Sequence, residues 1–332
     1  MSDTPQSALR GRWLIVSVVL VVLAALTFAL ALADVWTRAP QTPLRNVEVT
    51  VARGAPMRQV AQQLQDAGLV ANARLFEILA RTIGGGERIH YGVYAFAEGE
   101  GWGSILARLQ RGDTLVIPVV IPEGMPSIQV AERLNAAPRL SGEVAVPAEG
   151  SVYPATYDSS VGGDRAAVLQ AMQRKMTAEL DRLWAARGPD LAVRDKQEAV
   201  ILASIVEKET AVASERRRIA GLYSNRLKQG MPLQADPTVI YPITRGKPLG
   251  RRILRSELDS DNPYNTYRHA GLPPGPITNP GGASIEAVLH PERHDYLYMV
   301  ADGSGGHVFA RSYAEHQANV ARWRAHRREA GI

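Results

Sequence analysis

The sequence contains no cysteine, which excludes disulfide bonds, thiolate metal sites and cysteine nucleophiles. Aromatic residues make up only 6% of the chain, and Lys and Arg are scattered among Asp and Glu without a long basic tract. The net charge of +5 over 332 residues therefore gives little reason to expect nucleic-acid binding. Such a modest positive charge would suit a protein that works beside anionic lipid or an anionic polymer.

Motifs for metals and phosphates are also missing. His290 and His294 are the only histidines one helical turn apart, but Pro291 between them argues against a helix that carries both. The glycine-rich stretches at 84–86 and 303–306 lack the spacing of a phosphate-binding loop and are expected to form turns. We therefore predict no metal site and no cofactor.

The N-terminal region contains an uncharged apolar run from Leu14 to Ala33. About twenty helical residues at roughly 1.5 Å each span about 30 Å, which is the thickness of a bilayer hydrocarbon core. Trp13 and Trp36 flank the run, where interfacial aromatic residues are expected. Because Arg10 and Arg12 precede it, the positive-inside rule places the N-terminus in the cytoplasm and the remainder outside.

A cleaved signal peptide is the alternative interpretation of this run. Ala31-Leu32-Ala33 before Asp34 has the small-x-small form of a cleavage site. The apolar region of a signal peptide is usually about 7 to 15 residues long, and this run is longer. We therefore favour a retained single-pass anchor, although both interpretations export the rest of the chain.

Beyond the anchor, an alternating strand, a glycine turn and an amphipathic helix recur three times, beginning near Val47, Tyr91 and Val119. A further helix is expected over 72–81. The pattern predicts an α+β fold with a small module followed by a larger mixed domain. The expected order is a cytoplasmic N-terminus (1–12), a transmembrane helix (13–36), a linker (37–46), the small module (47–117) and the larger catalytic domain (118–328).

A buried helix in the larger domain ends in carboxylates. Asp195 is a suitable N-cap, and the segment from Ala199 to Val206 is apolar nearly all round, which predicts burial on every side. Glu207 follows at once, and low-dielectric surroundings would raise the pKa of its carboxyl toward the range of a general acid. The alternative is that Glu207 begins a solvated turn. Glu209 lies about 200° further round the helix, so we expect it to pair with Arg216 or Arg217 instead.

Gln234 and Asp236 are candidates for a substrate groove. They stand two residues apart, a spacing that places both side chains on one side of an extended segment. Pro237 favours an extended conformation at Asp236. In a groove, the Asp236 carboxylate would orient substrate or stabilise positive charge on it. The alternative is an Asx turn that precedes Pro237.

Four further residues could contact a sugar. Asn265 offers the amide donor and acceptor that an N-acetyl group needs. Tyr241, Tyr264 and Tyr267 offer flat apolar faces with a hydroxyl at the edge. Each tyrosine could equally be a core residue whose hydroxyl finds a partner inside the protein.

Five segments follow one another in the second half of the chain, and together they resemble one family. They are Ile-Val-Glu-Lys-Glu-Thr (205–210), Leu-Gln-Ala-Asp-Pro-Thr-Val-Ile-Tyr (233–241), Asn-Pro-Tyr-Asn-Thr-Tyr (262–267), Gly-Leu-Pro-Pro-Gly-Pro-Ile-Thr-Asn-Pro-Gly (271–281) and Tyr-Leu-Tyr-Met-Val (296–300). In this order they closely resemble the endolytic murein transglycosylases, the MltG or YceG-like family. The resemblance runs from about the membrane segment to the C-terminus.

The resemblance implies a LysM-like small module and a lytic transglycosylase, a carbon-oxygen lyase that acts on polysaccharides. Such an enzyme cleaves the β-1,4 bond between N-acetylmuramic acid and N-acetylglucosamine in nascent glycan strands. Glu207 would protonate the leaving oxygen and then deprotonate the C6 hydroxyl, forming a 1,6-anhydro end that terminates strand elongation. The implied location is the inner membrane with the catalytic domain in the periplasm, in association with peptidoglycan synthases.

Two other functions remain open from the sequence. A hydrolytic muramidase would cut the same bond with Glu207 as the acid and Asp236 helping to place water. A non-catalytic, membrane-anchored peptidoglycan-binding protein would use the same motifs only to fold.

Overall fold

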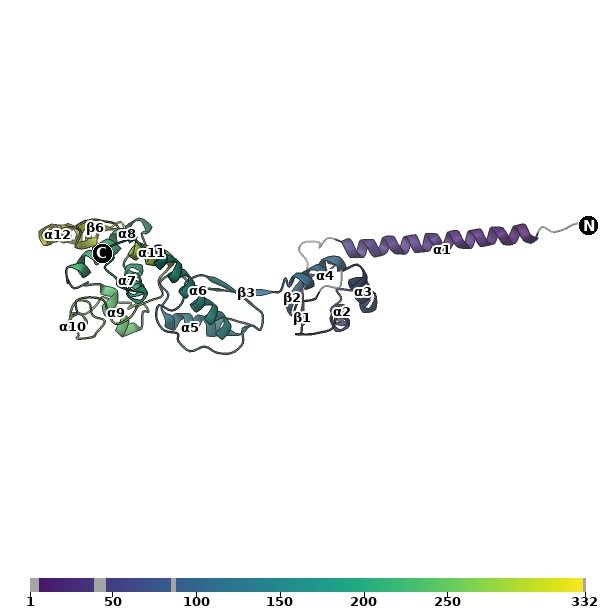
Figure 1. Ribbon diagram of the computed structural model, residues 1–332, viewed down its shortest axis with the longest axis horizontal. Coiled ribbons are helices and arrows are strands. Elements are labelled where there is room, and N and C mark those ends of the chain that lie inside the picture. The colour runs from purple at the N-terminus through teal and green to yellow at the C-terminus, as the bar shows by residue number, and fades with distance from the viewer. Residues whose placement is uncertain (1–5, 39–45, 85–87, 331–332) are drawn as a thin grey trace, which may run out of the picture. The chain divides into compact units, whose positions relative to one another are not determined.

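The computed structural model describes residues 6–38, 46–84 and 88–330 (Figure 1). The chain divides into two compact units, Met1–Ile117 and Pro118–Ile332. Helices and three two-stranded sheets occur in the described residues, so the prediction of a mixed α+β protein is confirmed. The LysM-like character of the small module stays a prediction.

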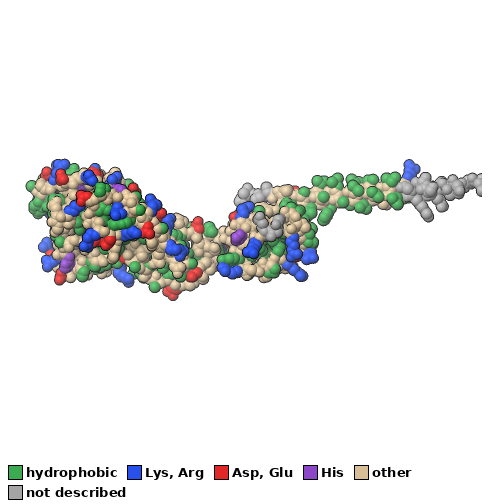
Figure 2. Space-filling model, viewed as in Figure 1, with side chains coloured by type: hydrophobic (Ala, Val, Ile, Leu, Met, Phe, Trp, Pro, Cys, Tyr) green, Lys and Arg blue, Asp and Glu red, His purple; other side chains and the backbone are tan. Residues whose placement is uncertain are grey.

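The N-terminal helix α1 (Gln6–Thr37) contains the apolar run. Its segment Arg12–Thr37 is long and apolar enough to cross a membrane. Hydrophobic side chains lie along the face of this helix that Figure 2 shows, and Trp13 is 68% exposed. By length and composition, α1 is therefore compatible with the predicted single-pass anchor.

The last turns of α1 pack onto protein. Leu32, Val35 and Trp36 contact the hydrophobic core of the small unit. The amide of Gly101 donates to the carbonyl of Arg38 at 3.1 Å, which joins the end of α1 to the start of a later helix. A side chain on Gly103 would come within 2.8 Å of the Trp36 ring nitrogen. Neighbouring protein therefore covers part of Trp36, and its position at the membrane interface stays a prediction.

The small unit follows the predicted order of strand, helix, helix and strand, and a third helix follows. Strands β1 and β2 pair antiparallel, with Val49 opposite Tyr94. Leu64, Phe76 and Ile105 carry the apolar faces of the three helices into one core and are fully buried. The elements are β1 (Asn46–Val51), α2 (Met57–Asp66), α3 (Ala73–Thr82), β2 (Gly92–Ala97) and α4 (Trp102–Arg111).

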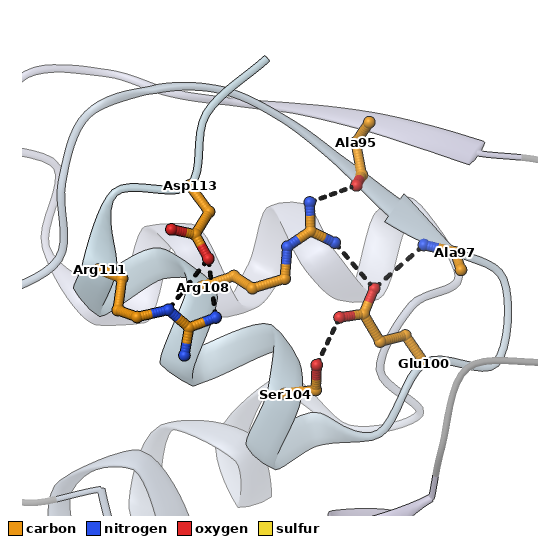
Figure 3. A network of polar contacts seen from close by, with 7 residues as sticks. All are labelled: Ala95, Ala97, Glu100, Ser104, Arg108, Arg111 and Asp113. Atoms are coloured by element: carbon orange, nitrogen blue, oxygen red, sulfur yellow. Dashed lines mark hydrogen bonds and ion pairs between the residues drawn. The ribbon is translucent and has the colours of Figure 1, made fainter. Parts of the chain in front are cut away.

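A buried carboxylate ties β2 to α4 (Figure 3). Glu100, which is 5% exposed, accepts hydrogen bonds from the Ala97 amide at 3.1 Å and the Ser104 hydroxyl at 2.6 Å. Arg108 donates to the same carboxylate at 3.0 Å and to the Ala95 carbonyl at 2.8 Å. The charge of Glu100 is therefore both paired and hydrogen-bonded, as burial requires.

The larger unit is mainly helical. Strands β5 (Tyr298–Ala301) and β6 (His307–Ala310) form an antiparallel hairpin, and β3 (Val116–Val120) pairs with β4 (Thr156–Ser160). The helices are α5 (Ser127–Ala136), α6 (Arg165–Ala185), α7 (Lys196–Glu209), the 3-10 turn η1 (Ala213–Glu215), α8 (Arg216–Lys228), α9 (Asp236–Thr244), α10 (Arg255–Leu258), α11 (Gly282–Leu289) and α12 (Tyr313–Ala330).

Helix α7 forms the centre of this unit and contacts both α8 and α11. All eight residues from Ala199 to Val206 are buried, as the apolar sequence predicts. The Ser204 hydroxyl is satisfied inside the core, since it donates to the Ile201 carbonyl at 2.7 Å and accepts from the Ile277 amide at 3.0 Å. The last turns of α7 are therefore packed inside this unit, and the carboxylates follow directly after the buried segment.

Candidate functional site

Helix α7 begins and ends with carboxylates that have different tasks. Asp195 is the N-cap, because its side chain accepts from the Glu198 amide at 2.8 Å. Glu207 and Glu209 lie in the last turn, about 200° apart around the axis, and they face different surroundings.

The Glu207 carboxylate supports the fold around α11. Its Oε2 accepts a hydrogen bond from the Gly281 amide at 3.0 Å, at the N-cap of that helix. The Glu123 carboxyl also lies against Gly281, because a Cβ placed there would be 2.0 Å from Glu123 Oε1. Glu207 thus joins α7 to the start of α11.

Glu209 occupies a drier position. The residue as a whole is partly exposed, but its Oε1 atom is buried and has no hydrogen-bond partner among the described residues. Burial raises the pKa of Glu209 to about 7, and the charge of Asp236 also raises it. A hydrogen bond from the buried Tyr223 opposes this shift, as does the nearby charge of Arg226. The carboxyl therefore carries a proton over part of the neutral pH range.

Glu209 lines a polar cleft of about 250 Å³. Gln234, Asp236 and Tyr267 lie on the wall of the same cleft, so three of the predicted groove residues meet the end of α7 there. The Tyr267 hydroxyl donates to Asp236 Oδ1 at 2.6 Å. Glu207 is not among the residues that line this cleft.

A buried threonine holds two of these loops together. Thr266 accepts from the Gln234 amide at its carbonyl and from the Ala235 amide at its hydroxyl, both at 3.0 Å. Its hydroxyl also lies 2.8 Å from the hydroxyl of Thr238. Because Tyr267 follows Thr266 directly, these bonds bring Tyr267 beside Gln234 and Asp236.

The expected extended conformation at Asp236 is wrong. Asp236 is the first residue of α9, and Pro237 lies in its first turn, where the missing N–H of proline costs nothing. Gln234 has a left-handed backbone with φ of 52°. Both side chains line the cleft because a left-handed turn leads into a helix, and not because they alternate along a strand.

The expected pairing of Glu209 with Arg216 or Arg217 is also wrong. Arg217 donates to the His290 carbonyl at 2.6 Å. The arginine near Glu209 is Arg226 of α8, whose NH1 donates to the Leu233 carbonyl at 2.7 Å and contacts Gln234 Oε1 at 3.3 Å. Burial lowers the pKa of Arg226 from its ordinary value.

Tyr241 and Tyr264 belong to a separate cluster around Glu149. Their rings are 4.9 Å apart, and Tyr241 hydrogen-bonds the Glu149 carboxyl. Burial raises the pKa of Glu149 above its ordinary value, while the Ser127 amide, 2.8 Å from Oε1, opposes that rise. Burial raises the pKa of Tyr241 to about 12. Neither tyrosine is among the residues that line the cleft of Glu209.

Asn265 organises its own loop. The side chain is 1% exposed, and its Nδ2 donates to the carbonyls of Leu258 at 2.9 Å and Ser260 at 2.7 Å. Its Oδ1 accepts from the Tyr267 amide at 3.0 Å. Because both ends of the amide are used inside the protein, this geometry gives no support to the expected contact with an N-acetyl group.

The sequence interpretation missed three polar residues that line the cleft: Tyr223, Arg226 and His307. A signal existed for Arg226, which follows Leu222 and Tyr223 at helical spacing and so places a charge on the apolar face of α8. Tyr223 follows the same spacing but resembles an ordinary core residue. His307 joins the cleft only through the β5–β6 hairpin, which no local pattern connects with α7.

The cleft has the composition of a general acid–base site. A buried carboxyl whose pKa lies near neutrality opens onto a polar cavity with a second carboxylate, an arginine and hydroxyl donors. Residues 49–322 match the YceG-like family, and because this match covers most of the chain, the protein belongs to that family.

Curated proteins from two bacteria are also similar to this chain. An endolytic murein transglycosylase of Bacillus subtilis (strain 168) is 27% identical over 308 residues, which cover 82% of this chain and 83% of the relative. One from Streptococcus pneumoniae serotype 2 is 27% identical over 327 residues, which cover 83% of this chain and 58% of the relative. The crystal structure of a yceG-like protein from Listeria monocytogenes aligns with a TM-score of 0.50 and 26% identity, covering 82% of this chain and 98% of that one.

Proposed function

We propose that this protein is an endolytic peptidoglycan lytic transglycosylase. It cleaves the β-1,4 bond between N-acetylmuramic acid and N-acetylglucosamine in nascent strands, and it leaves a 1,6-anhydro end that stops elongation. Membership of the YceG-like family and the names of the relatives support the substrate. The observation that carries the chemistry is the buried Glu209 carboxyl, whose pKa is about 7, in a polar cleft.

Glu209 is the acid of the first step. Near neutral pH a fraction of the enzyme holds Glu209 protonated, and this proton passes to the glycosidic oxygen as its bond to C1 breaks. Positive charge develops at C1 of the muramic acid. The carboxylate of Asp236, on the wall of the same cleft, stabilises that charge.

Glu209 is the base of the second step. The resulting carboxylate accepts the proton of the C6 hydroxyl while the C6 oxygen bonds to C1, which closes the 1,6-anhydro ring and consumes no water. The hydrogen bond from Tyr223 stabilises the carboxylate between the two steps. Burial raises the pKa of Tyr223 well above its ordinary value, so its hydroxyl remains a donor throughout.

This proposal moves the acid from Glu207 to Glu209. Glu207 is hydrogen-bonded to Gly281 and is not among the residues that line the cleft, whereas Glu209 is one of them. Gln234, Asp236 and Tyr267 are the substrate contacts. Tyr241, Tyr264 and Asn265 then support the fold around the groove.

The location proposed for the enzyme follows from α1. This helix is a single-pass anchor with a cytoplasmic N-terminus, and the catalytic unit works in the periplasm beside the inner membrane. The small unit binds glycan in the manner of a LysM domain, and the enzyme associates with glycan-polymerising synthases. A membrane-side position would let the enzyme meet strands as they are made.

The central experiment compares two variants of neighbouring carboxylates. We expect Glu209→Gln to lower the rate of glycan cleavage by about 1000-fold, because the amide can neither donate nor recover a proton. Glu207→Gln is the matched control, with a loss of less than about tenfold, because the Gln oxygen can still accept from Gly281. Rates on purified glycan strands and circular dichroism of both variants provide the measurement. Normal cleavage by folded Glu209→Gln would refute the assignment.

Product analysis separates this function from a hydrolytic muramidase, for which the second carboxylate at Asp236 is the supporting observation. Mass spectrometry of the strands should find 1,6-anhydro ends from the wild-type protein. Reducing ends would favour the muramidase. No new ends at all would favour a peptidoglycan-binding protein without catalytic activity.

A further inference from the structure

A carboxylate–histidine pair lies at the cleft that Glu209 lines. The proposed proton transfers give this pair no role. Glu215, the last residue of η1, accepts from the His307 backbone amide at 2.9 Å through Oε1. Its Oε2 lies 2.8 Å from Nδ1 of the His307 ring. The two side chains are only 13% and 16% exposed, and His307 lines the cleft.

The glycine-rich turn between β5 and β6 makes room for this pair. A Cβ on Gly306 would lie 2.8 Å from Glu215 Oε1, so any larger residue there would displace the carboxylate. The Gly306 amide donates to Asp302 Oδ1 at 3.2 Å, which fixes the turn from its other side. The position of His307 is therefore set by backbone contacts as well as by its ring.

The contact with Glu215 also selects the tautomer of His307. A carboxylate only accepts hydrogen bonds, so the proton of the neutral ring must be on Nδ1. Nε2 then carries a lone pair and is the nitrogen left for a ligand. Among the other polar side chains that line the cleft, Arg226 only donates, Asp236 accepts from Tyr267, and the Gln234 oxygen lies 3.3 Å from Arg226.

We infer that His307 is a further substrate-binding residue, whose Nε2, oriented through Glu215, accepts a hydrogen bond from a sugar hydroxyl. This inference rests on the proposed function, since it takes the ligand of the cleft to be a glycan. Glu215 is a positioning residue that acts only through His307. The pair orients the sugar, while the proton transfers remain with Glu209.

The tautomer can be measured without any substrate. Nitrogen-15 NMR of the imidazole rings, with the His307 signals assigned by their loss in His307→Phe, should show a neutral ring protonated at Nδ1. In Glu215→Gln the side-chain amide can donate to Nδ1, so we expect the proton to move to Nε2. A wild-type ring that is protonated at Nε2, or at both nitrogens near neutral pH, would overturn the inference.

Kinetics and binding test the contact itself. His307→Phe keeps a ring but removes the acceptor, and we expect kcat/KM to fall on the order of 10- to 100-fold, mostly through KM. His307→Gln should recover part of this loss, because an amide oxygen can accept in place of Nε2. The matched control is His269, whose Nε2 lies 3.0 Å from exposed Asp261 outside the cleft. His269→Phe and Asp261→Asn should leave kcat/KM unchanged.

A binding assay separates this inference from the proposed function. In the Glu209→Gln protein, which should bind strands without cutting them, adding His307→Phe should weaken glycan binding about tenfold or more. Unchanged binding and unchanged kcat/KM in folded His307→Phe, with the wild type active, would overturn the inference alone. A wild-type protein that neither binds nor cleaves glycan would remove the proposed function and this inference together.

Discussion

Glu207 and Glu209 show how strongly the surroundings of a side chain determine its chemistry. Both end the same buried helix, and a single exposed residue separates them. Glu207 accepts a hydrogen bond from a backbone amide, whereas one oxygen of Glu209 is buried and has no hydrogen-bond partner among the residues that the structure describes. Desolvation disfavours the charged form of Glu209, which keeps its proton bound nearer neutral pH and suits it to act as a general acid.

The pH dependence of activity should follow Glu209. Its pKa is raised to about 7, and the first step needs the protonated form. We therefore expect kcat/KM to fall as the pH rises through about 7. A pH profile on defined glycan strands checks this, and a rate that stays level from pH 6 to 9 would contradict it.

Stability should depend on pH through the same group. The folded pKa of about 7 lies above the ordinary value of 4.5, so the folded protein binds more protons than the unfolded chain between these values. Unfolding free energy is therefore lost as pH rises across that window, by on the order of 3 kcal/mol in total. Urea unfolding at pH 5 and pH 8 should show a smaller loss for Glu209→Gln, and equal losses in the two proteins would contradict this reasoning.

At the scale of single elements, the junction of β2 and α4 depends on one buried carboxylate. Glu100→Ala would leave the Ala97 amide, the Ser104 hydroxyl and Arg108 without their partner. We expect the small unit to lose about 2 kcal/mol of unfolding free energy. Asp113→Ala is the control, because it removes only the exposed pair with Arg111 and should cost about 0.5 kcal/mol or less. Thermal unfolding of both variants provides the measurement, and equal losses would show that burial of Glu100 has no special weight.

The elements that could be predicted from the sequence are those that are determined by residues within the element itself, such as an N-cap and an apolar run. Helix α7 follows from the Asp195 cap and an apolar run, and α3 from the Asn72 cap, whose side chain accepts from the Leu75 amide at 3.0 Å. Helix α9 was missed because proline both restrains the preceding residue and begins helices, and only the contacts of Thr266 decide between these effects.

The site was harder to predict because it joins distant segments. Gln234, Asp236 and Tyr267 were identified as groove residues, and all three line the cleft. The choice between Glu207 and Glu209 depends on Gly281 and Tyr223, which approach from α11 and α8. The sequence of α7 gives no information about these two neighbours. Residue types alone therefore favoured Glu207, the first carboxylate after the apolar run.

At the scale of the whole chain, α1 should serve location and the stability of the small unit, but not the chemistry. A chain that begins at Pro40 lacks Leu32, Val35 and Trp36, which pack on the small core. We expect it to cleave glycan strands at the wild-type rate while its small unit loses about 2 kcal/mol of unfolding free energy. A chain that begins at Ala31 should regain that stability. Full-length protein should stay in the membrane fraction after a high-salt wash, and its release by salt would contradict the anchor.

The docking of Leu32, Val35 and Trp36 on the small unit limits the part of α1 that lipid can cover. The stretch from Trp13 to Leu30 remains for the bilayer, and at about 1.5 Å per residue its eighteen residues span roughly 27 Å. This nearly equals a typical hydrocarbon core and leaves no spare turn. The proposed anchor would therefore be sensitive to bilayer thickness through hydrophobic mismatch. A thicker membrane would have to thin locally around α1 or bring the small unit into contact with its headgroups.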